Sequence, residues 1–235
     1  MTGWAAKRFW TDATVEACPG GHTVRLDGRQ IRTPAKAPLI LPTAALAEAV
    51  AVEWRAQTGV VDPATMPCTR TANSAIDKLS VQFDAVADML ADYGGTDLLC
   101  YRATTPPELV ARQAAAWDPL LDWAGSALGA PLHIAAGVIP VPQPEPSLGA
   151  LKTRVAGLTP FQLAAFHDLV AISGSLILGF AVTARRLTPE AAWTASRIDE
   201  TWQAEQWGSD DDAARDEAIR KAAFLQADRF FGLCG

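Results

Sequence analysis

The stretch Thr23-Val24-Arg25-Leu26-Asp27-Gly28-Arg29-Gln30-Ile31-Arg32 decides how the chain begins to fold. Two short runs of β-forming residues flank Asp27-Gly28, a dipeptide typical of the two-residue turn of a β-hairpin. In the register that this turn sets, Val24 lies opposite Ile31. Asp27 and Gly28 are therefore predicted to be structural residues.

The hairpin is followed by signals for a short sheet and one helix. Three prolines between residues 34 and 42 limit further strand pairing. Thr43 suits the N-cap of a helix that runs to about Gln57. The predicted buried stripe of this helix contains Leu46, Val50 and Trp54.

Beyond Pro63 the pattern predicts helices almost throughout. The predicted helices are roughly Pro67–Leu79, Val81–Tyr93, Pro107–Leu128, Leu148–Leu158, Pro160–Ile172, Ser175–Arg186, Pro189–Trp207 and Asp210–Phe231. Asp118-Pro119 is expected to divide the third of them, with Asp118 as a new N-cap. Residues 97–102 and 132–139 are expected to be extended, and to pair with each other or with the N-terminal sheet.

These elements predict an α+β fold. A small β-rich N-terminal domain with one helix is expected over residues 1–64, followed by a larger, mostly α-helical domain over residues 65–235. A chain of 235 residues is long enough for this division.

The composition argues against two classes of protein. Hydrophobic residues make up 49% of the chain, too many for a disordered protein. The net charge of -6 argues against nucleic acid as the main ligand, because phosphate contacts need clustered Lys and Arg side chains.

The sequence also predicts where the protein works. Residues 1–8 lack the apolar core of a signal peptide and the long Arg- and Ser-rich stretch of a transit peptide, so we expect a cytoplasmic protein. The longest uncharged apolar run, residues 169–184, is shorter than a membrane span and is interrupted by Ser and Gly. It is expected to be a core helix, without stable insertion into a membrane.

Residue patterns that indicate catalysis are mostly missing. The sequence has no P-loop, no glycine-rich dinucleotide motif and no nucleophile elbow. His and Cys residues are scattered, without the spacing of a zinc site, at His22, His133, His167, Cys18, Cys68, Cys100 and Cys234. We therefore expect no catalytic residue, no cofactor and no metal. One alternative stays open, a metal-dependent hydrolase that uses His167 and Asp168 with further ligands from other helices.

A charged residue lies among tryptophans in the stretch Asp199-Glu200-Thr201-Trp202-Gln203-Ala204-Glu205-Gln206-Trp207-Gly208. On a continuous helix over residues 189–207, Glu200 shares one face with Trp193 and Trp207. Desolvation on that face would raise the pKa of Glu200 unless a cation or hydrogen-bond donors meet it.

Two interpretations of Glu200 stay open. It forms an internal ion pair with Arg185 or Arg186, or it faces a partner. Tryptophan beside charged residues is typical of interface hot spots, which favours the partner. Trp54 and Trp117 lie on apolar stripes and are predicted to be structural instead.

Several motifs, in their order and spacing, resemble a known family over nearly the whole chain. They are Lys7-Arg8-Phe9-Trp10, Leu26-Asp27-Gly28-Arg29 with Thr33-Pro34, Glu53-Trp54 with Gln57, Met66-Pro67, Asp97-Leu98-Leu99-Cys100-Tyr101, Gln113 with Trp117-Asp118-Pro119, Ser173-Gly174-Ser175, and Asp199-Glu200 with Gln203 and Trp207-Gly208. The family is that of the ATP synthase assembly chaperones that bind the free α subunit of the catalytic head.

The resemblance implies a chaperone that is monomeric when free and that shields the β-facing surface of the α subunit until the β subunit displaces it. It implies that Glu200 is the family's motif carboxylate, with Trp193, Gln203 and Trp207 as further partner-binding residues. Trp54, in the Glu-Trp motif, is implied to be structural. Eukaryotic relatives work in the mitochondrial matrix, and the chain resembles a bacterial member.

Overall fold

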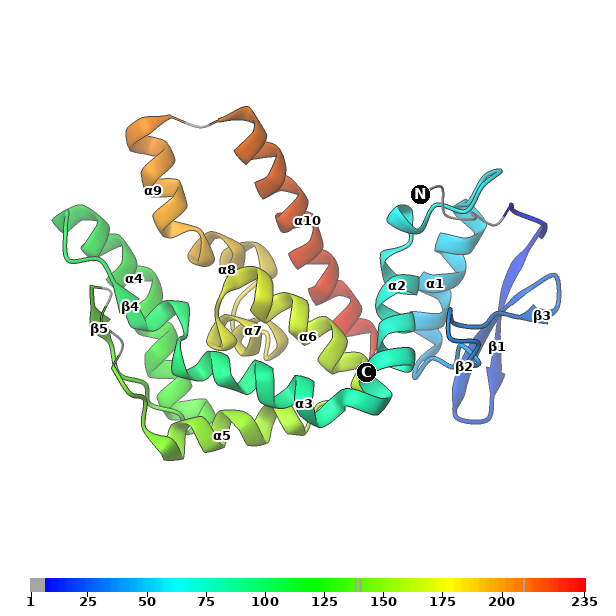
Figure 1. The fold of residues 1–235 in the computed structure, drawn as a ribbon, viewed down its shortest axis with the longest axis horizontal. Helices are drawn as coiled ribbons and strands as arrows, with labels where there is room; N and C mark the ends of the chain where they lie inside the picture. Colours follow the sequence, from blue (N-terminus) through cyan, green and yellow to red (C-terminus); the bar gives the residue numbers. More distant parts are fainter. Residues whose placement is uncertain (1–6, 138, 140, 209) are drawn as a thin grey trace. The chain divides into compact units, whose positions relative to one another are not determined.

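The computed structural model of the chain describes residues 7–137, 139, 141–208 and 210–235 (Figure 1). It divides into two compact units. Unit 1 contains Met1–Phe83, Thr159–Ala165 and Arg229–Gly235, and unit 2 contains Asp84–Leu158 and Phe166–Asp228. The α+β class is confirmed, whereas the sequence-based domain limits, 1–64 and 65–235, stay a prediction.

The predicted hairpin is present in unit 1. Strands β1 (Ala13–Cys18), β2 (Gly21–Leu26) and β3 (Arg29–Gln30) form an antiparallel sheet in that order. The turn residues Asp27 and Gly28 have φ angles of 46° and 82°, as this hairpin turn requires. The N–H of Ile31 donates to the carbonyl of Val24 at 3.1 Å, which confirms the predicted register.

Helix α1 (Ala44–Ala56) begins where its cap predicts. The hydroxyl of Thr43 accepts the N–H of Leu46, and Leu46 and Val50 are fully buried. The rest of unit 1 includes the short 3-10 helix η1 (Pro63–Thr65), helix α2 (Pro67–Ser74) and the π-helical turn η2 (Ala75–Leu79).

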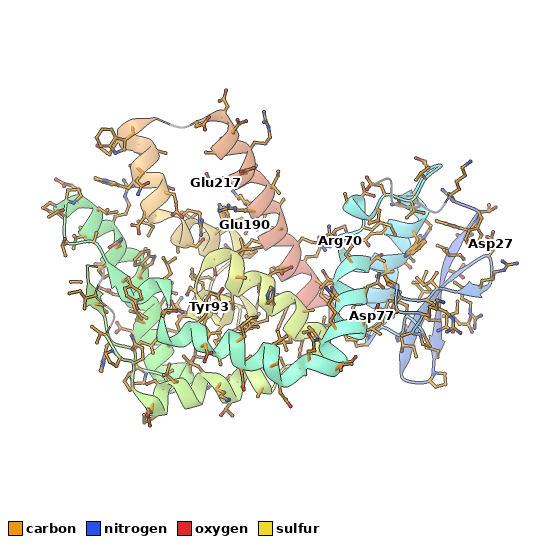
Figure 2. All side chains as sticks on the ribbon, in the orientation of Figure 1. Asp27, Arg70, Asp77, Tyr93, Glu190 and Glu217 are labelled. Atoms are coloured by element: carbon orange, nitrogen blue, oxygen red, sulfur yellow. The ribbon has the colours of Figure 1, made fainter. Side chains whose placement is uncertain are left out.

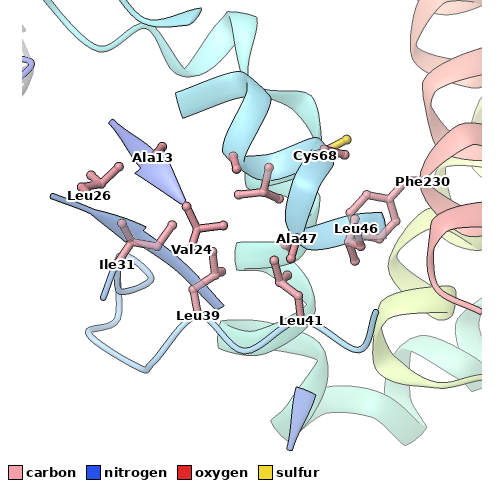
Figure 3. Packing of buried hydrophobic residues seen from close by; sticks show 14 of the residues in the cluster. Ala13, Val24, Leu26, Ile31, Leu39, Leu41, Leu46, Ala47, Cys68 and Phe230 are labelled. Carbon is pink, nitrogen blue, oxygen red and sulfur yellow. The ribbon is translucent and has the colours of Figure 1, made fainter. Parts of the chain in front are cut away.

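The core of unit 1 draws on the two ends of the chain. Val24, Leu41 and Leu46 pack in one cluster with Phe230, from near the end of α10 (Figure 3). Cys234 belongs to the same cluster.

The remaining helices and strands follow the predicted, mostly helical pattern. In chain order they are α3 (Ser80–Ala91), η3 (Asp92–Gly95), η4 (Leu98–Cys100), β4 (Tyr101–Arg102), α4 (Pro107–Trp123), η5 (Ala124–Leu128), β5 (Ala135–Ala136), α5 (Glu145–Ala156), α6 (Pro160–Ser173), α7 (Leu176–Thr183), α8 (Pro189–Ser196), α9 (Ile198–Trp207) and α10 (Asp211–Leu233). None of the described helices is long and apolar enough to cross a membrane.

Two details of unit 2 bear on the sequence-based expectations. The two segments expected to be extended pair with each other, but only through β4 and β5, which form a parallel pair. The expectation is wrong for residues 98–100, which form the 3-10 helix η4, and residue 138 lies outside the described residues. The expected division at Pro119 is wrong, because α4 continues through it. Trp117 and Leu120, on either side, are buried, and this packing holds the helix together. Asp118 instead forms an ion pair with Arg102 at 2.8 Å.

Candidate partner-binding site

The predicted helix over residues 189–207 is interrupted at Arg197. Helix α8 ends and α9 begins at this residue, whose φ of -116° and ψ of 19° are not helical. The single-helix prediction is therefore wrong. Nothing about an arginine marks a helix end; the break is stabilised by tertiary contacts of the Arg197 side chain.

The Arg197 guanidinium is nearly buried and reaches several groups at once. It lies 5.1 Å from the ring centroid of Trp193 and donates to the carbonyl of Ile172 at 3.2 Å. Its Nη1 lies 3.0 Å from Oε1 of Glu200. The side chain of Arg197 thus connects Trp193 on α8 to Glu200 on α9.

Glu200 pairs with Arg197, not with Arg185 or Arg186 as one interpretation expected. Arg185 instead pairs with Asp228. The Glu200 side chain is 57% exposed, so the expected desolvation of its carboxylate does not occur. Because an exposed ion pair contributes little to stability, this pair leaves the Glu200 carboxylate available to a partner.

Glu200 lies on the wall of a groove of about 540 Å³ between α9 and the first half of α10, which Figure 1 shows as neighbouring helices. We call this the α9–α10 groove. Its lining includes all four predicted partner-binding residues, Trp193, Glu200, Gln203 and Trp207. Trp193 is 4% exposed and forms the floor, whereas Trp207 is 88% exposed.

The rest of the α9–α10 groove combines small and acidic side chains. Ala204 faces it from α9, and Ala213 and Ala214 from α10. Asp216 and Glu217 also line it, the latter labelled in Figure 2.

Helix α4 is hydrogen-bonded to both α8 and α9. Nε2 of Gln113 donates to Oδ1 of Asp199 at 2.6 Å, and the Trp117 indole donates to the carbonyl of Ala195 at 2.8 Å. Gln113 and Trp117 are both buried. Asp199 therefore points into unit 2, whereas its neighbour Glu200 points into the groove.

An exposed clamp near the end of α9 adds to this anchoring. The Arg112 guanidinium donates to both carboxylate oxygens of Glu205, at 3.0 and 2.9 Å, and lies 5.0 Å from the Trp202 ring centroid. Its hydrogen bonds lower the pKa of Glu205. The role of Arg112 could not be predicted from the sequence, because 93 residues separate it from Glu205 and no local signal joins them.

Other motif residues belong to unit 1 and stabilise its fold. Glu53 caps α2, accepting the N–H groups of Cys68 and Thr69 at 2.6 and 2.8 Å. Half-buried Trp54 packs edge-on against Trp10, with ring centroids 5.1 Å apart. These contacts account for the Glu-Trp motif in structural terms.

Asp27 forms part of the turn and also binds the backbone before β1. Its carboxylate accepts the N–H groups of Thr11 and Asp12. These hydrogen bonds lower the pKa of Asp27, with that of Asp12 as the largest cause. Asp27 therefore ties the turn, which Gly28 completes, to the segment before β1.

Asp97 is a buried carboxylate whose role was not predicted from the sequence. It accepts the hydroxyl of Ser175 at 2.8 Å and the N–H groups of Leu99 and Ile177 at 3.0 Å each. Burial nevertheless raises the pKa of Asp97 to about 6. The serine of the Ser173-Gly174-Ser175 motif thus binds the aspartate of the Asp97-Leu98-Leu99 motif.

The alternative hydrolase site is limited to the pair that the sequence contains. His167 Nδ1 lies 3.0 Å from Oδ1 of Asp168. In the described part of the chain, no three His, Cys, Asp or Glu side chains gather as metal ligands would. The pair therefore forms a local contact on α6 without the further ligands that this alternative requires.

The chain is similar to ATP12 chaperone proteins. The model of the ATP12 chaperone protein family matches residues 7–125. Protein atp12, mitochondrial, from Schizosaccharomyces pombe is 27% identical over 219 residues, which cover 88% of this chain and 75% of that protein.

Two crystal structures are similar to this chain over nearly its full length. Atp12 from Paracoccus denitrificans is 54% identical, with 98% of this chain and 99% of that chain covered and a TM-score of 0.96. A protein from Agrobacterium tumefaciens is 41% identical, with 97% and 86% covered and a TM-score of 0.92.

Proposed function

Because the chain belongs to the ATP12 chaperone family, which acts in ATP synthase assembly, we propose that it binds the free α subunit of the catalytic head. It covers the surface of the α subunit that later faces the β subunit. An unassembled subunit exposes this apolar surface to aggregation, and a chaperone that covers it keeps the subunit available.

The observation that carries the proposal is the position of Trp207 beside Glu200 on the α9–α10 groove. A tryptophan that is 88% exposed leaves a large apolar surface in water. Tryptophan is also among the residues that dominate binding energy at protein interfaces. The groove therefore has the chemistry of a protein-binding site.

The four lining residues have different parts in this proposal. Glu200 and Gln203 offer a charge and an amide to the client, and Trp207 covers its apolar surface. Trp193 supports them from the floor of the groove. Release requires only that the β subunit bind the same α surface more tightly, since competition for one surface needs no chemical step.

We expect the protein to act in the bacterial cytoplasm, and as a monomer when free, as the family resemblance implies. The test is size-exclusion chromatography with light scattering on the purified protein mixed with the isolated α subunit of its own organism. We expect a one-to-one complex that dissolves when the β subunit is added. If the two folded proteins elute separately, the proposed function is wrong.

A further inference from the structure

The two helical walls of the α9–α10 groove, the second half of α9 and the first half of α10, are exposed to solvent. Every described residue from Gln203 to Gly208 and from Asp210 to Ala223 is exposed. Most helices in proteins owe their stability to one face that packs against another element. Apart from the clamp between Arg112 of α4 and Glu205, no element in the described part of the chain covers the second half of α9 or the first half of α10.

The shape of the groove admits a backbone at close range. Ala204, Ala213 and Ala214 face it with single methyl groups, and nearly buried Trp193 closes its floor. Small side chains allow another element to approach closely, while Trp193 and Trp207 provide apolar surface for it to bury.

Because both walls of the groove are helices, a helical segment binds there more favourably than an extended one. The backbone N–H and C=O groups of α9 and α10 are already bonded within each helix. An extended segment laid between them would lose water without gaining backbone partners. A helix satisfies its own backbone. The wall from Ala213 to Arg220 matches roughly two to three turns at about 1.5 Å per residue.

The charge of the groove also limits which helices would bind. Among its lining residues are the carboxylates of Asp210, Asp216 and Glu217, and in the described part of the chain no ion pair joins them to a cation. The Arg197 guanidinium is already held by Glu200, which leaves Arg220 to offset these three. The groove therefore has an excess of negative charge, which favours a basic partner.

We propose that the α9–α10 groove binds a basic amphipathic helix of the α subunit, two to three turns long. Its apolar face lies on Trp193, Ala213 and Trp207, and its Lys or Arg side chains meet Asp216 and Glu217. This inference rests on the proposed function, because the client supplies the helix.

The first test fills the groove. Ala213→Trp places a bulky side chain where the helix would lie, and we expect it to weaken binding of the α subunit at least about tenfold. The matched control is Ala218→Trp, also exposed on α10 but outside the groove lining, about 140° round the helix axis at 100° per residue. The control should bind as the wild type does, and circular dichroism should show the same helix content for all three proteins.

The second test reverses the charge. The double variant Asp216→Lys with Glu217→Lys should weaken binding about tenfold or more and should reduce the salt dependence of the dissociation constant. The control Asp84→Lys changes the charge at an exposed position on α3 and should have a much smaller effect.

A photo-crosslinking amino acid at position 213 identifies the occupant. We expect it to crosslink to one helical segment of the α subunit that is rich in Lys or Arg, and the same group at position 218 to give no such crosslink.

The outcomes separate the two proposals. If the wild type forms no complex, the proposed function is wrong and this inference falls with it. If the complex forms but Ala213→Trp and the double variant bind unchanged, only the inference is overturned. A crosslink to a second copy of this chain, or to an acidic or extended segment of the α subunit, also overturns it.

Discussion

Nε2 of Gln113 donates to Oδ1 of Asp199 at 2.6 Å, and this bond orients two adjacent carboxylates differently. Asp199 is held against α4, which leaves Glu200 on the α9–α10 groove. Oε1 of Gln113 also accepts the N–H of Ala103, so one buried amide forms hydrogen bonds with two separate segments of the chain.

Replacement of Gln113 should lower the stability of the fold. Gln113→Leu leaves the N–H of Ala103 and the Asp199 carboxylate without their partner, and we expect the free energy of unfolding to fall by about 2 to 3 kcal/mol. Gln203→Leu, at an exposed glutamine on the groove, should change it by less than about 0.5 kcal/mol. Urea denaturation of both variants measures this difference. Equal effects would mean that the Gln113–Asp199 bond does not support α9.

Reversal of the charge at Glu200 should affect binding more than stability. Glu200→Lys breaks an exposed ion pair with Arg197, so the free energy of unfolding should change by less than about 1 kcal/mol. We expect affinity for the α subunit to fall about tenfold or more. Titration calorimetry on the folded protein measures the affinity, with Glu190→Lys on α8 as the control. A variant that unfolds while its folded fraction binds normally would favour a purely internal role for Glu200.

A charge at Trp54 should damage unit 1. Trp54→Arg breaks the packing against Trp10 and places a guanidinium in a half-buried site, and we expect a loss of about 3 kcal/mol in the free energy of unfolding. The matched change Trp207→Arg, at a residue that is 88% exposed, should alter stability by less than about 0.5 kcal/mol. Thermal unfolding of the pair tests this, and similar losses in both variants would contradict a structural role for Trp54.

Asp97 should make stability depend on pH. Its pKa is about 6 in the folded protein, against an ordinary value of 3.8, so the folded state holds the proton more tightly than the unfolded state does. The contribution of Asp97 to stability is therefore greatest below about pH 4 and is lost as the pH rises through about 6.

Removal of this carboxyl should show the dependence directly. Between pH 4 and pH 7, the free energy of unfolding of the wild type should fall relative to that of Asp97→Asn by roughly 2 to 3 kcal/mol, at about 1.4 kcal/mol per pKa unit. Urea denaturation across this range measures both curves. Parallel curves would show that the Asp97 pKa is the same in the folded and unfolded states.

Local signals made much of the fold predictable. Asp27-Gly28 fixes the turn and the Val24–Ile31 register through its own backbone conformation, and Thr43 marks the start of α1 through one hydrogen bond. The motifs also identified the family correctly. These features depend on residues that are close together in the sequence.

The site was less predictable, because its geometry depends on distant contacts. The break at Arg197 is stabilised by the carbonyl of Ile172, 25 residues earlier, and a helical wheel drawn through it could not give the true partner of Glu200. Arg112 and Glu205 are likewise joined only by the folded chain. The four predicted partner-binding residues nevertheless line one groove, since three of them lie on α9 itself and Trp193 on the adjacent α8.

The core of unit 1 has a consequence for how the protein is made. Phe230 and Cys234 pack in the same cluster as Val24, and the hydroxyl of Thr43 donates to the carbonyl of Leu233. A ribosome synthesises the N-terminal strands well before these residues. The first strands to emerge therefore wait for the end of α10 before their core is complete, and a nascent chain that stalls before Phe230 leaves this core open.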